Sequence, residues 1–453
     1  MKKKVQFALS TTHIIMLSFL TVILIGSFLL ALPISSKSGE PIPYIDALFT
    51  ATSATCVTGL VTLTTVTTWS VFGQIVILLL IQIGGLGVIT VITGLTLILH
   101  RKMGLKTNFL LQDALNLNTL SGLAIFVKKV ILGTFIVEAI GAIIYMFVFI
   151  PDFGMEGIWI SVFTSVSAFC NAGLDIIADN SLCGYALNPI VNFTTCALIV
   201  VGGLGYIVWW DILRVVKMFK KEGWRCFHKL TLHSKIVLLS TFVLIVVGGV
   251  GFLIFEYNNA LTIKEFSFFD KLQVSVFQSI TTRTAGFATI PQESLTNGSV
   301  MLSLFLMFIG GSPVGTAGGV KTVTVFVLLA TASSAIKNKN EVETFDRNLS
   351  TTITKKAVAV FCTSLGIVIL STLLLSTTVS APAIDILFET VSATATVGLT
   401  RNLTPFLNGW GKSIIIATMY FGRIGPISLA IAFKSRKEKV NNIKNPTEEI
   451  SVG

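Results

Sequence analysis

A short polar segment that ends in glycine recurs four times along this chain. The four glycines are Gly59, Gly173, Gly286 and Gly398, and each follows a stretch rich in Ser, Thr or Ala. Successive copies are about 113 residues apart, and a fixed period of this kind normally sets the architecture of a protein. The sequence therefore predicts four diverged copies of one unit, whose glycine segments surround a common axis.

The composition places these units in a membrane. Hydrophobic residues make up 53% of the 453 residues, charged residues only 12%, and the mean hydropathy is +0.84. A soluble protein usually carries about 25% charged residues. Eight apolar stretches are long enough to cross a bilayer, which takes about 20 residues. They cover residues 14–32, 70–99, 130–150, 187–210, 236–255, 299–336, 357–378 and 411–433. We therefore expect an all-α polytopic membrane protein with eight transmembrane helices.

The net charge of +11 indicates topology rather than binding to nucleic acid. Basic residues cluster at span ends that face away from the glycine segments, for example within 214–235 and 337–356. Because Lys and Arg concentrate in cytoplasmic loops, both termini are expected in the cytosol and the glycine segments open outward. The first span has no clear cleavage site and is longer than the core of a signal peptide, so we expect it to be retained. These features predict a multi-pass protein of the plasma membrane.

Each copy has the same order of segments: a span, a shorter semi-apolar segment, the glycine segment and a second span. The shorter segments are too short to cross a bilayer and suggest re-entrant helices. They lie at about 44–55, 159–169, 269–282 and 385–394, and they carry Phe49, Phe163, Phe277 and Phe388. We expect four tandem helix–pore loop–helix repeats around a pseudo-fourfold pore. The repeats cover residues 1–100, 101–229, 230–350 and 351–435, and a cytosolic tail follows at 436–453.

Such loops favour the passage of a cation. Irregular backbone at membrane depth is tolerated where it lines a water-filled cavity, and inward carbonyls can replace the hydration shell of an ion. Glycine permits the backbone angles that turn carbonyls inward, and the C-termini of four short helices favour positive charge. The expected ion-binding residues are Thr55, Cys56, Val57, Thr58, Gly59, Cys170, Asn171, Ala172, Gly173, Arg283, Thr284, Ala285, Gly286, Ala395, Thr396, Val397 and Gly398. The neighbouring threonines, Thr55, Thr58, Thr282, Thr284, Thr394 and Thr396, are expected to hold the loops by hydrogen bonds.

The glycines alone would also suit ordinary helix packing, which is common in membrane proteins. Four glycines at matched spacing, each after a segment too short to span, favour a pore instead.

The motifs resemble those of the Trk/Ktr/HKT cation transporter superfamily, in particular the membrane subunit of Ktr-type potassium uptake systems. They read Thr-Cys-Val-Thr-Gly59-Leu, Phe-Cys-Asn-Ala-Gly173-Leu-Asp, Thr-Arg-Thr-Ala-Gly286-Phe and Ala-Thr-Val-Gly398-Leu. The resemblance implies a K⁺ filter at the carbonyls near the four glycines. It also implies preference for K⁺ over Na⁺, because members with serine at the first position tend to favour Na⁺ and this chain keeps Gly59. Na⁺ is a second candidate ion, as a stimulant of uptake or as cargo.

A second glycine pattern lies within the second span of each copy, and its third copy is expanded. Residues 310–321 hold five glycines and a proline, which cannot sustain a straight helix. A phosphate-binding loop is excluded there, because Val320 separates the last glycine from Lys321 and no strand precedes the segment. We expect a flexible gate below the filter, and the family resemblance implies an intramembrane gating loop at this position. The expected gate residues are Gly310, Gly311, Ser312, Pro313, Gly315, Thr316, Gly318, Gly319, Lys321 and Arg423.

Several charged residues fall within apolar sequence. Arg423 lies inside the last span, where a charge is costly and usually faces a pathway. The resemblance implies that it contributes to the barrier, and a salt bridge within the helix bundle is the alternative. Arg283 is expected to brace the third loop by pairing with a carboxylate, and Glu138 to be a structural partner. Asp175 is expected either to attract cations at the mouth or to act as a cap.

Two functions from different classes remain open. The first is a channel-like K⁺ uptake subunit, and the alternative is a secondary active transporter, such as a symporter, that couples K⁺ or Na⁺ to an ion gradient. Such transporters commonly use inverted repeats, whereas these repeats run in parallel and offer few intramembrane carboxylates. An enzyme lacks support, because no metal or nucleophile constellation surrounds the four histidines.

A gate needs a regulator, and the sequence has no nucleotide-binding fingerprint. We therefore expect a separate cytosolic partner. The resemblance implies that this partner is a ring of RCK subunits that binds a nucleotide, and that the membrane subunit is a homodimer with a pore in each protomer.

Overall fold

The computed structural model describes residues 11–98, 123–339 and 341–425. Both termini and the predicted tail at 436–453 lie outside these described residues. The described residues are mostly helical, and the two strands among them form one small antiparallel hairpin. The expectation of a mostly helical protein is confirmed.

Four helices are individually long and apolar enough to cross a membrane. They are α1 (Thr11–Ala31), α7 (Leu123–Phe153), α11 (Leu232–Glu256) and α15 (Thr351–Ser376). Much of their apolar surface stays exposed; the side chain of Phe147 on α7 is 73% exposed and that of Phe242 on α11 is 67% exposed. Extensive exposed apolar surface of this kind is typical of contact with lipid.

Each long helix packs against a short helix that follows it in the chain. The short helices are α2 (Tyr44–Cys56), α8 (Glu156–Cys170), α12 (Phe268–Thr281) and α16 (Ala383–Ala395). They lie within a few residues of the segments expected from the sequence. Their phenylalanines, Phe49, Phe163, Phe277 and Phe388, are completely buried. The short helices therefore form the core, and the long helices surround them.

The second spans are broken rather than straight. Helix α4 (Val71–Leu86) meets α5 (Val88–Ile98) at 96°, and α9 (Pro189–Leu204) meets α10 (Tyr206–Glu222) at 98°. Each break falls on a glycine with positive φ, +84° at Gly87 and +88° at Gly205, a conformation that side chains with a Cβ rarely adopt. The spans expected at 70–99 and 187–210 therefore each contain a sharp break that the sequence did not predict. Counting each bent pair as one span raises the number of candidate spans in the described residues to six.

The remaining second spans are short helices. In the third copy, α13 (Asn297–Phe308) and α14 (Thr322–Ile336) are separated by the 309–321 loop. In the fourth, α17 (Gly409–Ile424) ends at Gly425, whose φ is +91°.

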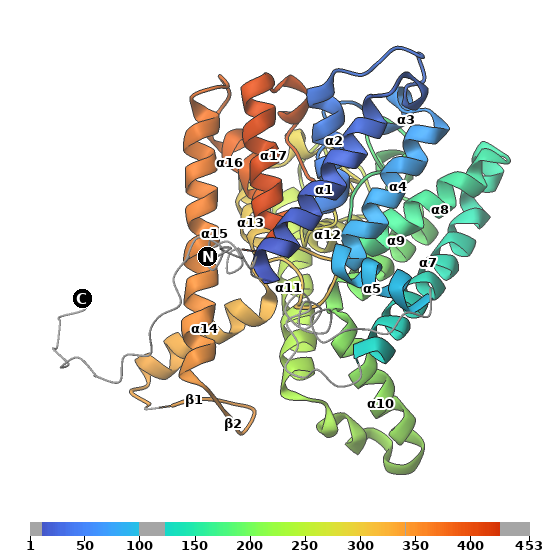
Figure 1. Ribbon diagram of the computed structural model, residues 1–453. Helices are drawn as coiled ribbons and strands as arrows, with labels where there is room; N and C mark the ends of the chain where they lie inside the picture. The colour runs from blue at the N-terminus through green and yellow to red at the C-terminus, as the bar shows by residue number, and fades with distance from the viewer. Residues whose placement is uncertain (1–10, 99–122, 340, 426–453) are drawn as a thin grey trace, which may run out of the picture.

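The connections add small elements at the two ends of the molecule. They are α3 (Thr65–Thr68), η1 (Pro33–Ser35), η2 (Cys183–Tyr185), η3 (Gly223–Lys229), η4 (Gln292–Ser294), η5 (Thr404–Phe406), β1 (Val342–Thr344) and β2 (Arg347–Leu349). Figure 1 shows α10, α14 and the β1–β2 hairpin at one end and α2 and α3 at the other. Helix α2 therefore lies at the end of the molecule opposite the hairpin.

Candidate functional site

Three of the four short helices end in the same way. The residue after the last helical turn is in the left-handed conformation, at Val57 (φ +58°), Asn171 (φ +60°) and Thr396 (φ +53°). Each donates its backbone N–H back into the helix, which closes the helix and turns the chain sharply. In the third copy the cap Thr282 stays right-handed, and Thr284 takes the positive φ of +70°. We refer to residues 57–59, 171–173, 284–286 and 396–398 as the glycine loops.

The glycine loops meet in one closed ring. Each glycine faces the carbonyl oxygen of the residue before the next copy's glycine. The pairs are Gly59 with Ala172, Gly173 with Ala285, Gly286 with Val397, and Gly398 with Thr58. A Cβ on the first three glycines would lie 2.6, 2.5 and 2.6 Å from those oxygens, closer than real Cβ atoms come. All four glycines also have positive φ, from +64° to +98°, so the ring has no room for side chains at these positions.

Hydroxyl groups of the short helices hold the ring. Ser53 Oγ accepts the Gly59 N–H at 3.0 Å, and Ser392 Oγ accepts the Gly398 N–H at 3.1 Å. In the second copy Ser167 Oγ accepts from the next residue along, Leu174, at 3.1 Å. These serines were not expected from the sequence, although each lies six residues before the glycine of its copy.

The threonines expected to hold the loops have a different arrangement. Within the described residues, Oγ1 of Thr55, Thr58 and Thr396 is buried and has no hydrogen-bond partner. The same is true of both side-chain polar atoms of Asn171. Buried polar atoms without a partner are uncommon in proteins, so these atoms remain available to water or an ion. Thr282 and Thr394 bond carbonyls within their own short helices. The expected bracing by these five threonines is therefore wrong.

The second glycine pattern allows the short helices to approach the second spans. A Cβ on Gly84 would collide with the carbonyl oxygen of Thr55, one on Gly202 with that of Phe169, and one on Gly422 with that of Thr394. Each of these carbonyls lies at the C-terminal end of a short helix. In the third copy, Gly310 instead faces the carbonyl oxygen of Gly318 in its own loop. Three of these glycines are therefore close-packing positions.

The 309–321 loop crosses from the third copy to the break between α9 and α10. Ser312 N–H donates to the carbonyl oxygen of Gly203 at 3.0 Å, and Thr316 N–H donates to that of Gly202 at 3.2 Å. In return, Tyr206 N–H donates to the Val314 carbonyl oxygen at 3.0 Å. The base of the loop is closed by Gly310 N–H and the Val320 carbonyl oxygen at 3.0 Å. These bonds give the loop a defined position between α13 and α9.

The tip of the loop touches the glycine loops. Gly318 N–H donates to Oγ1 of Thr284 at 3.2 Å. A Cβ on Gly318 would collide with Thr396 Oγ1, so the fourth glycine loop also lies against the tip. Thr316 Oγ1 donates to the carbonyl oxygen of Phe169, near the end of α8, at 3.1 Å. The tip therefore contacts the second, third and fourth copies.

Two basic side chains bind this region through backbone carbonyls. Arg423 donates from Nη1 to the Thr316 carbonyl oxygen at 2.6 Å and from Nη2 to the Gly84 carbonyl oxygen at 2.5 Å. Lys321 Nζ donates to the carbonyl oxygen of Ala317 at 2.6 Å. In the described part of the chain neither side chain is paired with a carboxylate, so the alternative of a helix-bundle salt bridge at Arg423 finds no support.

The other charged residues are dispersed around the ring. Arg283 is buried and donates to Thr241 Oγ1 at 3.5 Å. Among the described residues it has no carboxylate partner, so the expected pairing of Arg283 with a carboxylate is wrong. Asp175 is half-buried and accepts the Ile177 N–H at 3.4 Å, as a capping group does. Burial raises the pKa of Asp175 to about 6, although hydrogen bonds from Ser181 and the backbone partly offset it.

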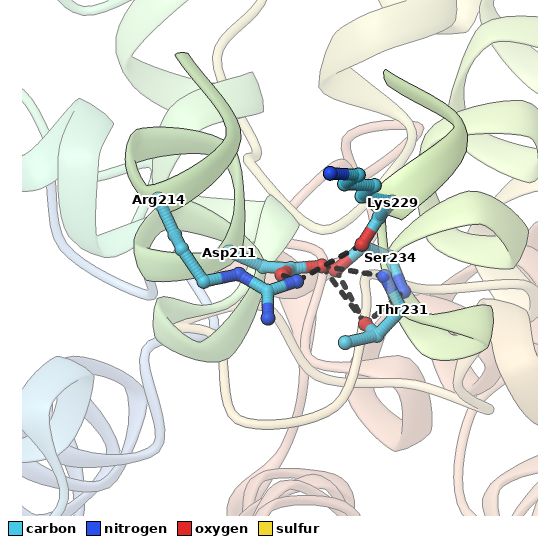
Figure 2. Close-up of polar contacts among 5 residues, drawn as sticks. All are labelled: Asp211, Arg214, Lys229, Thr231 and Ser234. Carbon is cyan, nitrogen blue, oxygen red and sulfur yellow. Dashed lines mark hydrogen bonds and ion pairs between the residues drawn. The ribbon is translucent and has the colours of Figure 1, made fainter. Parts of the chain in front are cut away.

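A polar cluster fixes the connection from α10 to α11, on the side of the molecule that carries the hairpin. Asp211 accepts the backbone N–H and the hydroxyl of Thr231, both at 2.9 Å, and Thr231 caps α11 (Figure 2). Arg214 pairs with Asp211 at 2.6 Å and donates to the Lys229 carbonyl oxygen at 3.0 Å. These bonds fix the bent-away helix α10 to the start of α11.

Comparison with known proteins now identifies the family. The profile of the TrkH family, described as cation transport protein, matches residues 1–444. The chain belongs to the TrkH family. It is therefore a multi-pass membrane protein of a transporter family.

Two relatives match over nearly their whole length. The potassium/sodium uptake protein NtpJ of Enterococcus hirae is 39% identical over 100% of this chain and 99% of its own. The Ktr system potassium uptake protein B of Bacillus subtilis is 40% identical over 97% of this chain and 96% of its own. The crystal structure of the potassium transporter TrkH from Vibrio parahaemolyticus has the same fold, with a TM-score of 0.74. It is 17% identical and covers 95% of this chain and 86% of that one.

Proposed function

We propose that this chain is the membrane subunit of a K⁺ uptake system of the plasma membrane, and that K⁺ crosses through the ring of glycine loops. The proposal rests on the ring, because four segments far apart in sequence meet there with glycine at every closest approach. Backbone carbonyls in such a narrow passage can replace the hydration shell of K⁺. The names of the two relatives support K⁺ as the ion, with Na⁺ as a further cargo or stimulant.

The electrostatic setting supports a cation. Helices α2, α8, α12 and α16 all end at the ring, and a helix C-terminus carries roughly half a negative charge. The filter would comprise the carbonyls around Gly59, Gly173, Gly286 and Gly398, braced by the serine hydroxyls below them. Because Gly59 is retained, we propose K⁺ preference over Na⁺.

The gate would be the 309–321 loop together with Arg423 and Lys321. The tip lies directly against the glycine loops, and two basic side chains hold it through its carbonyls. Positive charge beneath the ring opposes the passage of a cation. We propose that this arrangement is the closed state and that K⁺ flux requires the loop to move aside.

The assembly follows from the same proposal. Four helix–loop–helix repeats, 1–100, 101–229, 230–350 and 351–435, would give eight membrane-crossing segments around one pore in each protomer, with both termini in the cytosol. We propose a homodimer regulated by a cytosolic ring of nucleotide-binding RCK subunits. The name of the Bacillus subtilis relative, which is part of a Ktr system, supports a multi-component assembly.

The test is K⁺ and Na⁺ flux into liposomes that contain the purified chain. Wild type should carry K⁺ down its gradient with preference over Na⁺, and Gly59→Ser should shift that preference toward Na⁺. Gly366→Ala is the matched control, because a Cβ there meets nothing within 4 Å. Saturable flux that stops without an imposed Na⁺ or H⁺ gradient would favour the coupled transporter instead.

A further inference from the structure

Glu138 is a carboxylic acid in the interior of the long membrane helix α7. Its side chain is buried, with 4% exposed. Ionisable groups at such depth are costly and are usually functional. In the described part of the chain no basic side chain pairs with it, so burial disfavours a full charge and leaves hydrogen bonding as its role.

The carboxyl group joins three elements. Gln82 on α4 donates its amide N–H to Glu138 Oε2 at 3.3 Å. Cys170 Sγ, at the end of α8, lies 3.8 Å from Glu138 Oε1 and 3.9 Å from Gln82 Oε1. The backbone carbonyl of Glu138 also accepts the hydroxyl of Ser165 on α8 at 2.7 Å. The end of α8 is therefore bonded to both α4 and α7 at one point.

Cys170 has almost no freedom within this contact. A Cβ on Gly85 of α4 would lie 2.5 Å from Cys170 Sγ, so the thiol is held between that glycine and Glu138. Cys170 directly precedes Asn171, where the second glycine loop begins with its left-handed turn. The contact of the thiol therefore lies directly beside the start of the second glycine loop.

The second glycine loop, which follows Cys170, differs from the others in its backbone angle and in its hydrogen bond to serine. Gly173 has a φ of +64°, against +98° at Gly59 and Gly398. The serine of this copy bonds Leu174 rather than the glycine itself. A different anchor therefore fixes the second loop.

We propose that Glu138 is a positioning residue of the second glycine loop, which acts through Cys170 and Gln82 to set the ring dimensions that distinguish K⁺ from Na⁺. This inference rests on the proposed function. Glutamine retains the shape and an acceptor oxygen, and the Gln82 amide can turn to bond it. Leucine keeps similar bulk and loses the hydrogen bonds.

The experiment measures the K⁺:Na⁺ flux ratio in membrane vesicles from bacteria that lack other K⁺ uptake systems and express the full-length chain. Glu138→Leu should lower the ratio about fivefold, the order expected for the loss of one buried hydrogen bond. Glu138→Gln should retain the wild-type ratio. The ratio is independent of protein abundance, so a variant that is merely less stable does not change it.

Four further variants complete the test. Gln82→Leu should lower the ratio as Glu138→Leu does. The double variant should have the same ratio as either single variant, because both substitutions remove the same hydrogen bond between Gln82 and Glu138. If Glu138→Leu does not fold, Cys170→Ala tests the same contact from the other side. Tyr145→Phe is the control, since it removes another buried hydrogen bond of α7, to Thr195.

Three outcomes would overturn the inference. They are a wild-type ratio in Glu138→Leu, a wild-type ratio in Cys170→Ala where the leucine variant fails to fold, and an equal loss in Glu138→Gln. If wild type itself shows no K⁺ preference, the proposed function fails first.

Discussion

The backbone N–H of Gly318 donates to Oγ1 of Thr284 at 3.2 Å, so the 309–321 loop is hydrogen-bonded to the third glycine loop. Thr284 is completely buried, and its positive φ turns it out of the regular path of the chain. This hydrogen bond couples the glycine loop, which is the proposed filter, to the 309–321 loop, which is the proposed gate. Moving the loop aside must break it.

This bond predicts that Thr284→Val raises K⁺ flux in the absence of any regulator. Valine keeps the branched shape but cannot accept the Gly318 N–H, which removes about 1 kcal/mol from the closed arrangement and raises the open fraction about fivefold. Thr284→Ser keeps the hydroxyl and should stay at the basal level. Flux into liposomes containing the purified chain provides the measurement. Equal flux in the valine and serine variants would show that the bond does not hold the loop.

Arg423 should contribute more than Thr284, because it bonds the carbonyls of Thr316 and Gly84 from one guanidinium. Charged hydrogen bonds are worth about 1.5–3 kcal/mol each, so Arg423→Ala should raise basal K⁺ flux by about tenfold or more. Arg423→Lys keeps the charge but cannot span both carbonyls, and we expect an intermediate flux. Deletion of 311–319 should also raise the flux in the same assay. If K⁺ flux rises in neither Arg423→Ala nor the deletion variant, the protein has no internal gate at this loop.

The short helices were predictable because their signals are local. Each is a semi-apolar segment of limited length that ends just before a glycine, and α2 and α16 match the expected ranges to within two residues. The ring itself followed from the spacing of the glycines. The serines that accept from the ring also have a local signal, since Ser53 and Ser392 each lie six residues before the glycine of their copy. The threonines lie nearer to the glycines in sequence, but Thr282 and Thr394 bond carbonyls of their own helices. Oγ1 of Thr55, Thr58 and Thr396 has no partner among the described residues.

The breaks in α4–α5 and α9–α10 were not predictable from the same information. Residues 70–99 read as one apolar stretch, and a glycine within a helix does not reveal its φ. Gly205 takes a positive φ where the 309–321 loop bonds its neighbours Gly203 and Tyr206. These contacts join residues more than a hundred positions apart, so no local pattern contains them.

External pH should modulate uptake through Asp175. Its pKa is raised to about 6, so the carboxyl is ionised above that pH and becomes neutral as the pH falls through it. Asp175 lies two residues after Gly173, and a negative charge at the mouth of a cleft concentrates cations there. We therefore expect the KM for K⁺ to rise about two- to fivefold below pH 6, with little change in maximal rate.

The matched variants for this pH effect replace other carboxylates near Asp175. Asp175→Asn should have the higher KM at every pH and lose the transition. Asp179 is exposed on the same loop, and Glu293 contributes negative charge from η4 near Cys183. If the transition persists in Asp175→Asn and disappears in Asp179→Asn or Glu293→Gln, the assignment to Asp175 is wrong. Initial rates of K⁺ uptake across a range of external pH distinguish these cases.

Close packing of the second spans against the short helices gives a stability prediction at Gly84. A Cβ there would collide with the Thr55 carbonyl and lie 2.9 Å from Cγ2 of Val57, and the backbone on either side is fixed. Overpacking of this kind costs about 1–3 kcal/mol, so Gly84→Ala should lower the Tm of the purified chain. Gly366→Ala is the control: it also lies within a helix but has open space, and alanine favours helix by about 1 kcal/mol. Its Tm should stay level or rise, whereas an equal fall in both variants would mean that the contact with Thr55 does not set the packing.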